Sequence, residues 1–295
     1  MPEPKIFVGM ILGGEPGIYL PYSMGAVYDI VDYFIVVDTG VTDGSLEKFM
    51  KEQDPKGKVI MIKSSWMNDY SAARNVYLKF FRDRIWTPSD QDTNYYYWRI
   101  DFDEQYEGNL PYLKEYLKKF SHQMGFRFHF STFDSSHFTL NEVQPQESRV
   151  NLFRYNPSIK YKNSIHEIPV YSGGGFEQIL YGDEVHDIDL GIQFVPVDVA
   201  SYLHFSYCDE KTCAKKIMNY TEQYVRTGIV TPEKLEALKK GDNWAWTDHK
   251  SSLKFTGVYP TILKTAPFLQ NPPWKILFED GSCLEPKKIE VPSNV

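Results

Sequence analysis

The sequence predicts an α/β protein built on a doubly wound, mostly parallel sheet. In the first 120 residues, short apolar runs typical of buried strands alternate with segments typical of helices. Such alternation produces βαβ units, whose strands run parallel and whose helices cover both faces of the sheet. After residue 120 the strand-like segments become shorter and helices return only from 209 to 240. We therefore expect a smaller antiparallel portion and C-terminal helices beside the parallel sheet.

The elements follow one another in a regular order. The first half predicts buried strands over 6–12, 33–37, 59–62 and 95–100. Helices are expected over 20–30, 45–51, 72–84 and 110–120. A glycine-rich turn over 38–44 opens the second helix, and Asp69 or Ser71 is placed to cap the third. Shorter strands are expected over 126–133, 150–155, 159–161 and 168–171.

Length, composition and charge limit the class of protein. The 295 residues, 42% of them hydrophobic, are enough for one large α/β core over 1–205 with a helical extension over 206–295. A formal net charge of −7, from 39 acidic and 32 basic residues, argues against binding of nucleic acid through a basic face. Aromatic residues make up 16% of the chain and suit either a core or stacking on sugars and bases, with the core favoured.

The compartment is predicted from cysteine usage and from apolar runs. Three cysteines without metal-ligand spacing indicate neither a disulfide framework nor a zinc site, and fit a reducing compartment. The apolar run 6–12 is too short for a signal peptide, and no run approaches the ~18 apolar residues of a membrane span. We expect a soluble cytoplasmic protein, or one that works at the periphery of a membrane.

Three carboxylates crowd the end of the fourth predicted strand. Asp101, Asp103 and Glu104 directly follow the aromatic run 95–100. Carboxylates this close repel one another unless one keeps its proton or a hard cation such as Mg²⁺ or Mn²⁺ neutralises them. The carboxyl ends of strands in an open α/β sheet are also where ligands bind. The sequence therefore predicts a ligand site, with a divalent metal, at this end of the strand.

Other polar residues are expected at the same edge of the sheet. Asp38 follows the second strand and could accept hydrogen bonds from a nucleotide, although Asp-Thr-Gly is also common turn chemistry. Glu15 follows the first strand and could equally belong to the first turn of a helix. Arg74 lies in the first turns of its helix, where it could contact a diphosphate or form an ordinary surface ion pair.

Taken in order, these segments resemble the successive blocks of family 2 glycosyltransferases. The blocks are the first strand with Glu15, the segment Tyr33–Ser45, the segment Trp66–Asn75 and the acidic run Ile100–Glu104. Later, 150–154 is similar to the arginine-containing strand of that family, and 165–167 to its His-Glu block. The resemblance covers roughly residues 5–170 and depends on the order and spacing of the blocks. The chain departs from the usual pattern at Gly14 and Val41, where the family usually has Asn and Ser.

The resemblance implies a GT-A fold of Rossmann-like type, with 1–205 as its catalytic core. It further implies a nucleotide-sugar donor, most often a UDP-sugar, a divalent metal, and transfer with inversion at the anomeric carbon. Asp103, with Asp101, would hold Mn²⁺ or Mg²⁺ against the diphosphate as a DXD motif. Glu15 and Asp38 would contact the nucleoside, while Arg74 and Asp101 would contact the donor.

Two further roles are assigned on the same resemblance. Glu167 is the first candidate for the base that an inverting displacement requires, with Asp183 or Asp187 as alternatives. His204 follows a predicted strand and is expected either to complete the metal shell or to be a core or loop histidine. Trp244 and Trp246 could belong to a lid over the site or could anchor the C-terminal segment.

The acceptor and two other classes of function stay open. A glycan hydroxyl is the expected acceptor, and a lipid-linked sugar, a protein side chain or a small molecule are alternatives. A nucleotidyltransferase would also use acidic metal ligands on a doubly wound sheet, but the chain has no basic glycine-rich loop after its first strand. A non-catalytic module that binds a sugar or nucleotide is the third class, and the intact acidic cluster argues against it.

Overall fold

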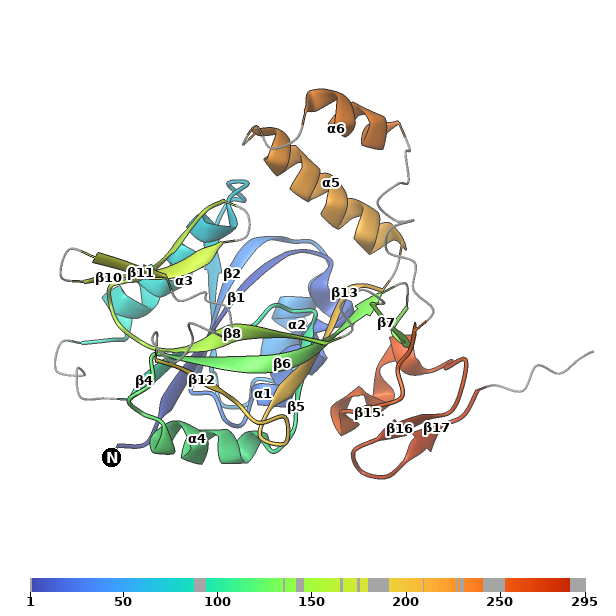
Figure 1. The fold of residues 1–295 in the computed structure, drawn as a ribbon, viewed down its shortest axis with the longest axis horizontal. Coiled ribbons are helices and arrows are strands. Elements are labelled where there is room, and N and C mark those ends of the chain that lie inside the picture. The colour runs from blue at the N-terminus through green and yellow to red at the C-terminus, as the bar shows by residue number, and fades with distance from the viewer. Residues whose placement is uncertain are drawn as a thin grey trace, which may run out of the picture.

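A mixed sheet of 11 strands organises the structure (Figure 1). The computed structural model describes residues 2–87, 94–134, 136–141, 146–164, 167–173, 176–179, 191–208, 210–226, 228, 231–240 and 253–286. Along the main path the strands are ordered β14-β7-β6-β8-β4-β1-β2-β3, and β12, β13 and β5 join at β6 and β13. The neighbours β3, β2, β1 and β4 are parallel, while β8 runs antiparallel to both β4 and β6.

The bounds of the elements are as follows. The sheet contains β1 (Lys5–Gly14), β2 (Tyr33–Val41), β3 (Val59–Lys63), β4 (Tyr95–Arg99), β5 (Glu104–Glu107), β6 (Gly125–Asp134), β7 (Thr139–Leu140), β8 (Gln146–Arg154), β12 (Ile192–Phe194), β13 (Ser201–Tyr207) and β14 (Leu253–Lys254). Two small sheets contain β9 (Ile159–Lys162), β10 (Ile168–Gly173) and β11 (Phe176–Ile179), and β15 (Val258–Tyr259), β16 (Ile276–Phe278) and β17 (Cys283–Leu284). The helices are α1 (Leu20–Val27), α2 (Ser45–Glu52), α3 (Tyr70–Arg84), α4 (Leu110–Lys119), α5 (Glu210–Arg226) and α6 (Pro232–Lys239), with short 3₁₀ helices η1 (Pro16–Ile18), η3 (Thr261–Thr265) and η4 (Pro267–Leu269).

The predicted fold class is confirmed, with small shifts in the element ends. The helix expected over 72–84 begins at Tyr70, because Asp69 accepts a hydrogen bond from the backbone N–H of Ala72 at 2.9 Å. The helix expected over 20–30 ends at Val27. The sequence pattern did not predict β5, whose composition, Glu-Gln-Tyr-Glu, lacks the apolar run that indicates a buried strand.

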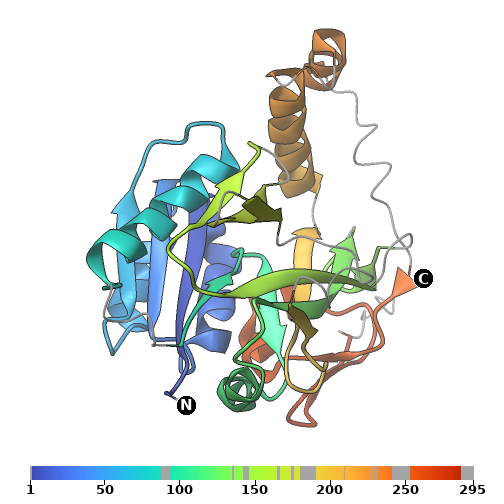
Figure 2. The same cartoon turned by 60° about the vertical axis from the view of Figure 1, so that its left-hand side comes forward.

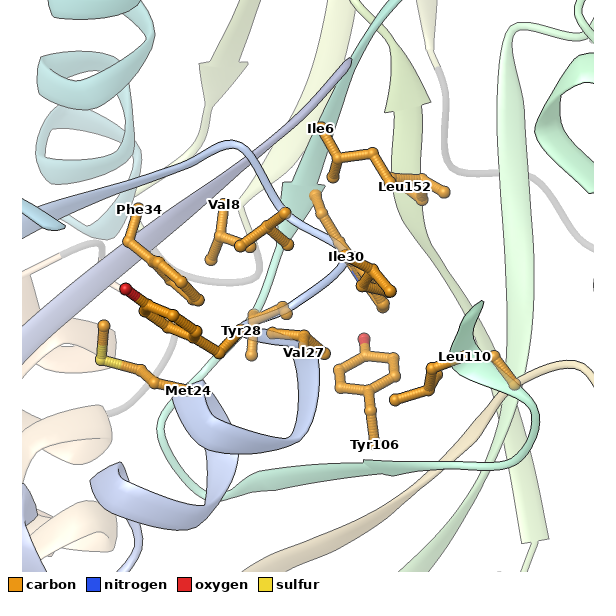
Figure 3. Close-up of a cluster of buried hydrophobic side chains, with 14 of the residues drawn as sticks. Ile6, Val8, Met24, Val27, Tyr28, Ile30, Phe34, Tyr106, Leu110 and Leu152 are labelled. Carbon is orange, nitrogen blue, oxygen red and sulfur yellow. The ribbon is translucent and has the colours of Figure 1, made fainter. Parts of the chain in front are cut away.

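Hydrophobic clusters on the two faces of the sheet hold the helices in place. Alternate residues of β1, including Ile6 and Val8, face a cluster that contains Met24 and Val27 of α1 (Figure 3). The intervening Phe7 faces the opposite cluster, where its ring stacks on that of Phe81 of α3 with centroids 3.8 Å apart. Because consecutive strand residues point to opposite faces, β1 is buried on both sides, as in a doubly wound sheet.

The last described segment, 253–286, contains no α-helix: it consists of short strands and two 3₁₀ helices that pack on the sheet. Its buried Tyr259, Leu263 and Leu269 join one cluster with Phe133 and Phe205 of the sheet. The helices α5 and α6 stand away from this segment and project beyond the sheet (Figures 1 and 2). A division at residue 205 stays a prediction. None of the described helices has the length and apolar character needed to cross a membrane.

Gly9 is required by the close approach of α3 to β1. A Cβ atom at this position would lie 2.5 Å from a ring carbon of Tyr77, which is completely buried. Real Cβ atoms essentially never approach another atom so closely, and the Tyr77 ring is held by its neighbours on α3 and β4. The glycine therefore sets the distance between α3 and the sheet, and with it the position of the residues that α3 carries.

We expect Gly9→Ala to lower the free energy of unfolding by about 1–3 kcal/mol, because the added methyl group overpacks a rigid contact. Urea unfolding followed by circular dichroism measures the change. Gly25→Ala is the matched control: its Cβ would meet the flexible end of Ile262 at 3.0 Å within helix α1, where alanine is the better helix former. Equal stability losses in the two variants would contradict the close-approach argument.

Candidate active site

The predicted site residues gather at the carboxyl ends of the parallel strands. Asp38 lies opposite Leu12 near the ends of β2 and β1, and Asp101 comes two residues after Arg99, which lies opposite Gly9. Parallel strands end at the same edge of a sheet, so these acids share the edge at which ligands bind in open α/β folds. The turn from Asp101 to Glu104 is closed by two hydrogen bonds, from Glu104 N to Asp101 O (3.0 Å) and from Asp101 N to Glu104 Oε2 (3.1 Å).

Arg74 ties two of the predicted residues together. It lies on the second turn of α3, its side chain is 4% exposed, and its Nε donates to Glu167 Oε1 at 2.6 Å. Its Nη2 donates to both oxygens of Asp101, at 3.0 and 3.3 Å. Arg74 is thus not in an ordinary surface ion pair but is a buried cation shared by two carboxylates, and its contact with a diphosphate stays a prediction.

This arrangement keeps all three groups ionised. Burial alone would raise the pKa of Asp101, but Arg74 and Arg99 outweigh it and hold that pKa well below the ordinary 3.8. Burial likewise opposes ionisation of Glu167, yet Arg74 and then Arg99 lower its pKa below 4.5. The pKa of Arg74 is raised well above its ordinary value, since Asp101 and Glu167 overcome the effect of its burial. At neutral pH the site therefore contains two carboxylates bridged by a guanidinium.

Three buried tyrosines, Tyr77, Tyr97 and Tyr161, form a hydrogen-bonded layer against Arg74. The hydroxyl group of Tyr97 is hydrogen-bonded to those of Tyr77 and Tyr161, the latter at 3.0 Å. Arg74 Nη1 lies 3.5 Å from the Tyr77 hydroxyl, and the guanidinium carbon lies 5.6 Å from the centre of the Tyr161 ring. Burial raises the pKa of each of these hydroxyls, so the layer stays neutral and can donate and accept hydrogen bonds.

Asp103 and His204 form the second group of the site. Strand β13 pairs antiparallel with β5, which sets His204 opposite Glu104 and brings His204 Nε2 to 3.9 Å from Asp103 Oδ2. The pairing is fixed by a hydrogen bond from Phe205 N to Asp103 O at 2.9 Å. Two side chains that are distant in sequence therefore converge two residues along the chain from Asp101 of the bridge.

The Asp103–His204 pair fits a divalent metal ion as a partial ligand set. Ligands at about 2.1 Å from one ion lie roughly 3 to 4 Å apart, and the separation of 3.9 Å is within this range. Within the described residues, no three His, Cys, Asp or Glu side chains gather as a complete metal cluster. Asp101, the other predicted ligand, directs both oxygens at Arg74. An ion here would therefore take its remaining ligands from substrate phosphates and water, as Mg²⁺ and Mn²⁺ commonly do.

Glu104 is the member of the acidic run that keeps its proton. Its side chain is completely buried, and Arg149 Nη1 lies 3.7 Å from its Oε1. Burial first, and then the charge of Asp101, raises the pKa of Glu104 to about 8. The three neighbouring acids have thus separate surroundings: Asp101 pairs with Arg74, Asp103 faces His204, and Glu104 is buried in β5.

The residues expected at the nucleoside are less distinctive. Asp38 is buried, and its Oδ1 accepts from the backbone N–H groups of Gly40 (2.9 Å) and Val41 (2.8 Å). This is the turn chemistry that the sequence offered as the alternative to nucleotide binding. Glu15 is exposed in the turn that precedes η1. Both lie at the ends of their strands as predicted, and their contact with a nucleoside stays a prediction.

Two arginines at the site were not predicted. Arg99 at the end of β4 and Arg149 of β8 both interact electrostatically with Asp101. Arg154, the arginine of the block that resembles the family, is exposed and lies one residue beyond the Phe153–Tyr97 pair, opposite Tyr96. Because β8 runs antiparallel to β4, Arg154 lies beside the amino-terminal half of β4, away from the acidic edge, and Arg149 is the arginine of β8 nearer to that edge.

Several predicted residues lie outside the described part of the chain. They are His166, Asp183, Asp187, Trp244 and Trp246. The alternative bases and the proposed lid therefore stay predictions.

Removal of Arg74 should be costly, because two buried carboxylates would lose their common cation. We expect Arg74→Gln to lower the free energy of unfolding at pH 7 by about 3–5 kcal/mol, measured by urea unfolding. The matched control, Arg82→Gln, removes an arginine from the exposed face of the same helix, where it pairs with Asp83, and should cost less than about 1 kcal/mol. Similar losses in both variants would argue against the buried bridge.

Comparisons with known proteins give distant structural similarity. No family model matches the chain, and no curated protein matches its sequence. Among solved structures the chain is similar to TarS of S. aureus, with 10% sequence identity and a TM-score of 0.42 over 80% of this chain and 42% of that chain. It is also similar to TarS 1–349, alone (TM-score 0.39) and in complex with UDP (TM-score 0.42), each at 10% identity over 79% of this chain and 69% of that chain. The chain thus spans less than half of the longer TarS chain, and we assign its function from its own residues.

Proposed function

We propose that the protein is a metal-dependent, inverting glycosyltransferase that moves a sugar from a nucleotide-sugar to an acceptor hydroxyl. A UDP-sugar is the favoured donor and a glycan the favoured acceptor. The observation that carries the proposal is the convergence of Asp103 with His204 beside the bridged pair Asp101 and Glu167, at the ligand-binding edge of the sheet. The order of sequence blocks that resembles family 2 glycosyltransferases supports the same activity.

Asp103 and His204 would hold the metal ion, Mn²⁺ or Mg²⁺. An imidazole ligand favours Mn²⁺, since Mg²⁺ prefers oxygen ligands. When bound, the ion would supply positive charge that offsets the negative charge of the departing nucleoside diphosphate. Asp101 is better placed to orient the donor than to ligate, because both of its oxygens accept from Arg74.

Glu167 is suited to accept the proton of the acceptor hydroxyl. Its lowered pKa keeps it ionised at neutral pH, and the bond from Arg74 to Oε1 fixes the orientation of the carboxylate. In the displacement, the acceptor oxygen forms a bond to the anomeric carbon while the bond from that carbon to the phosphate oxygen breaks. The hydroxyl proton passes to Glu167, and the electron pair leaves with the nucleoside diphosphate.

The alternative of a nucleotidyltransferase has less support. Strand β1 ends in Gly13 and Gly14 and is followed by Glu15, and no lysine or arginine follows until Lys48 in α2. An enzyme that transfers a nucleotidyl group from a triphosphate needs positive charge around the three phosphates. The acidic turn therefore favours a diphosphate donor held through a metal ion.

The first test is a nucleotide-release assay on purified protein with UDP-, GDP-, dTDP- and CMP-sugars, each with Mn²⁺, Mg²⁺ or EDTA. We expect metal-dependent release from one donor and a loss of at least ~100-fold in Asp103→Asn, because the ion would lose its anionic ligand. Asp29→Asn, which changes an aspartate whose side chain is 88% exposed, is the matched control and should keep full turnover. Full turnover in a folded Asp103→Asn variant would refute the metal assignment, and an absence of both release and donor binding would refute the transferase.

The role of Glu167 is tested by the pH dependence of turnover. Because the pKa of Glu167 lies below 4.5, the carboxylate stays ionised as pH falls and the rate should decrease only below about pH 4.5. Glu167→Gln should lower kcat by about 10²–10⁴-fold and abolish this acid limb. The nucleotide affinity of the variant, measured by calorimetry, should stay close to that of the wild type. An unchanged kcat would mean that a residue other than Glu167 acts as the base.

A further inference from the structure

Arg99 is a buried cation without a hydrogen-bonding partner among the described residues. The residue is only 7% exposed, and its Nε is buried without an acceptor in the part of the chain that the structure describes. Its neighbour Arg74, by contrast, donates to Asp101 and Glu167. Buried polar groups are nearly always hydrogen-bonded, and an unsatisfied one in a folded protein calls for an explanation.

The strand places Arg99 in the middle of the site. Consecutive residues of β4 point to opposite faces, so Arg99 shares a face with Tyr97, whose hydroxyl belongs to the tyrosine layer under Arg74. Arg99 interacts electrostatically with Arg74, Asp101 and Glu167, and also with Arg149. It is therefore close both to the bridged carboxylates and to the arginine of β8.

The nearby carboxylates do not satisfy Arg99. The hydrogen bonds of Asp101 and Glu167 to guanidinium groups go to Arg74, and no ion pair within 4.0 Å joins Arg99 to an acid of the described residues. The charges of those acids favour a cation at this position, which is enough to retain it there. At least the buried Nε–H of this guanidinium is left to donate to another group.

We propose that Arg99 donates hydrogen bonds to an oxyanion of the donor substrate. A guanidinium is planar, always charged and matched in geometry to phosphate and carboxylate groups, and a buried one binds them more strongly than an exposed one. The oxyanion can belong to the diphosphate of the donor or to a carboxylate on its sugar. The proposal rests on the proposed function, since it names the part of that substrate which Arg99 binds.

The test compares ligand affinities of wild type and Arg99→Met, which keeps the length of the side chain and removes its donors. Isothermal titration measures binding of uridine, UDP, inorganic pyrophosphate, UDP-glucose and UDP-glucuronate, first with EDTA, which removes the contribution of a metal ion, and again with Mn²⁺. Arg82→Met on the exposed face of α3 is the matched control and should bind every ligand as the wild type does. Thermal unfolding of each variant shows that it is folded.

We expect Arg99→Met to weaken binding of the oxyanion-bearing ligand by about 10–100-fold, while uridine binding changes less than twofold. A loss for UDP and pyrophosphate assigns the contact to the diphosphate, and a loss confined to UDP-glucuronate assigns it to a sugar carboxylate. Equal losses for uridine and UDP, or no loss for any ligand, would overturn the proposal. If wild type binds pyrophosphate but no nucleotide even with Mn²⁺, the proposed function fails while the pyrophosphate arm still decides the role of Arg99. Binding of none of the ligands, with EDTA or with Mn²⁺, overturns both.

Discussion

The bridge formed by Arg74 between Asp101 and Glu167 is the interaction on which the site depends. It joins α3, the turn after β4 and the segment before β10, three parts of the chain that are separated by 27 to 93 positions. A buried charge is tolerated only when it is paired and hydrogen-bonded, so each member of the bridge fixes the position of the others. The bridge requires α3 to lie close to the sheet, which is the approach that Gly9 permits.

The three acids that follow β4 can lie close together in sequence because each has different surroundings. Asp101 faces the α3 side with Arg74, while Asp103 turns toward His204 on β13 and Glu104 is buried at the start of β5. If all three were ionised in one solvent pocket, their repulsion would open the turn. Glu104, as a largely protonated side chain at pH 7, accepts from the backbone of Asp101 and closes the turn that presents Asp103.

The parallel strands could be predicted from the sequence, because a strand buried on both faces requires a continuous apolar run such as Ile6–Leu12. It also placed Asp101, Asp103 and Arg74 at one edge, since strand ends in a doubly wound sheet are adjacent. It did not predict β5, where burial of Glu104 depends on strand partners distant in sequence. Nor did it distinguish Arg149 from Arg154, because the choice depends on the direction of β8, which only the pairing with β4 determines.

Aromatic side chains surround the polar site. The largest fully buried side chains include Trp98, Tyr96 and Tyr97 of β4, so the strand that ends in the acids is itself enclosed by aromatic rings. These rings exclude water below the site, and a low local dielectric strengthens each ionic interaction above them. The same exclusion makes an unsatisfied guanidinium at Arg99 costly in the free protein. A substrate oxyanion that satisfies it therefore gains more binding energy there than it would at the surface.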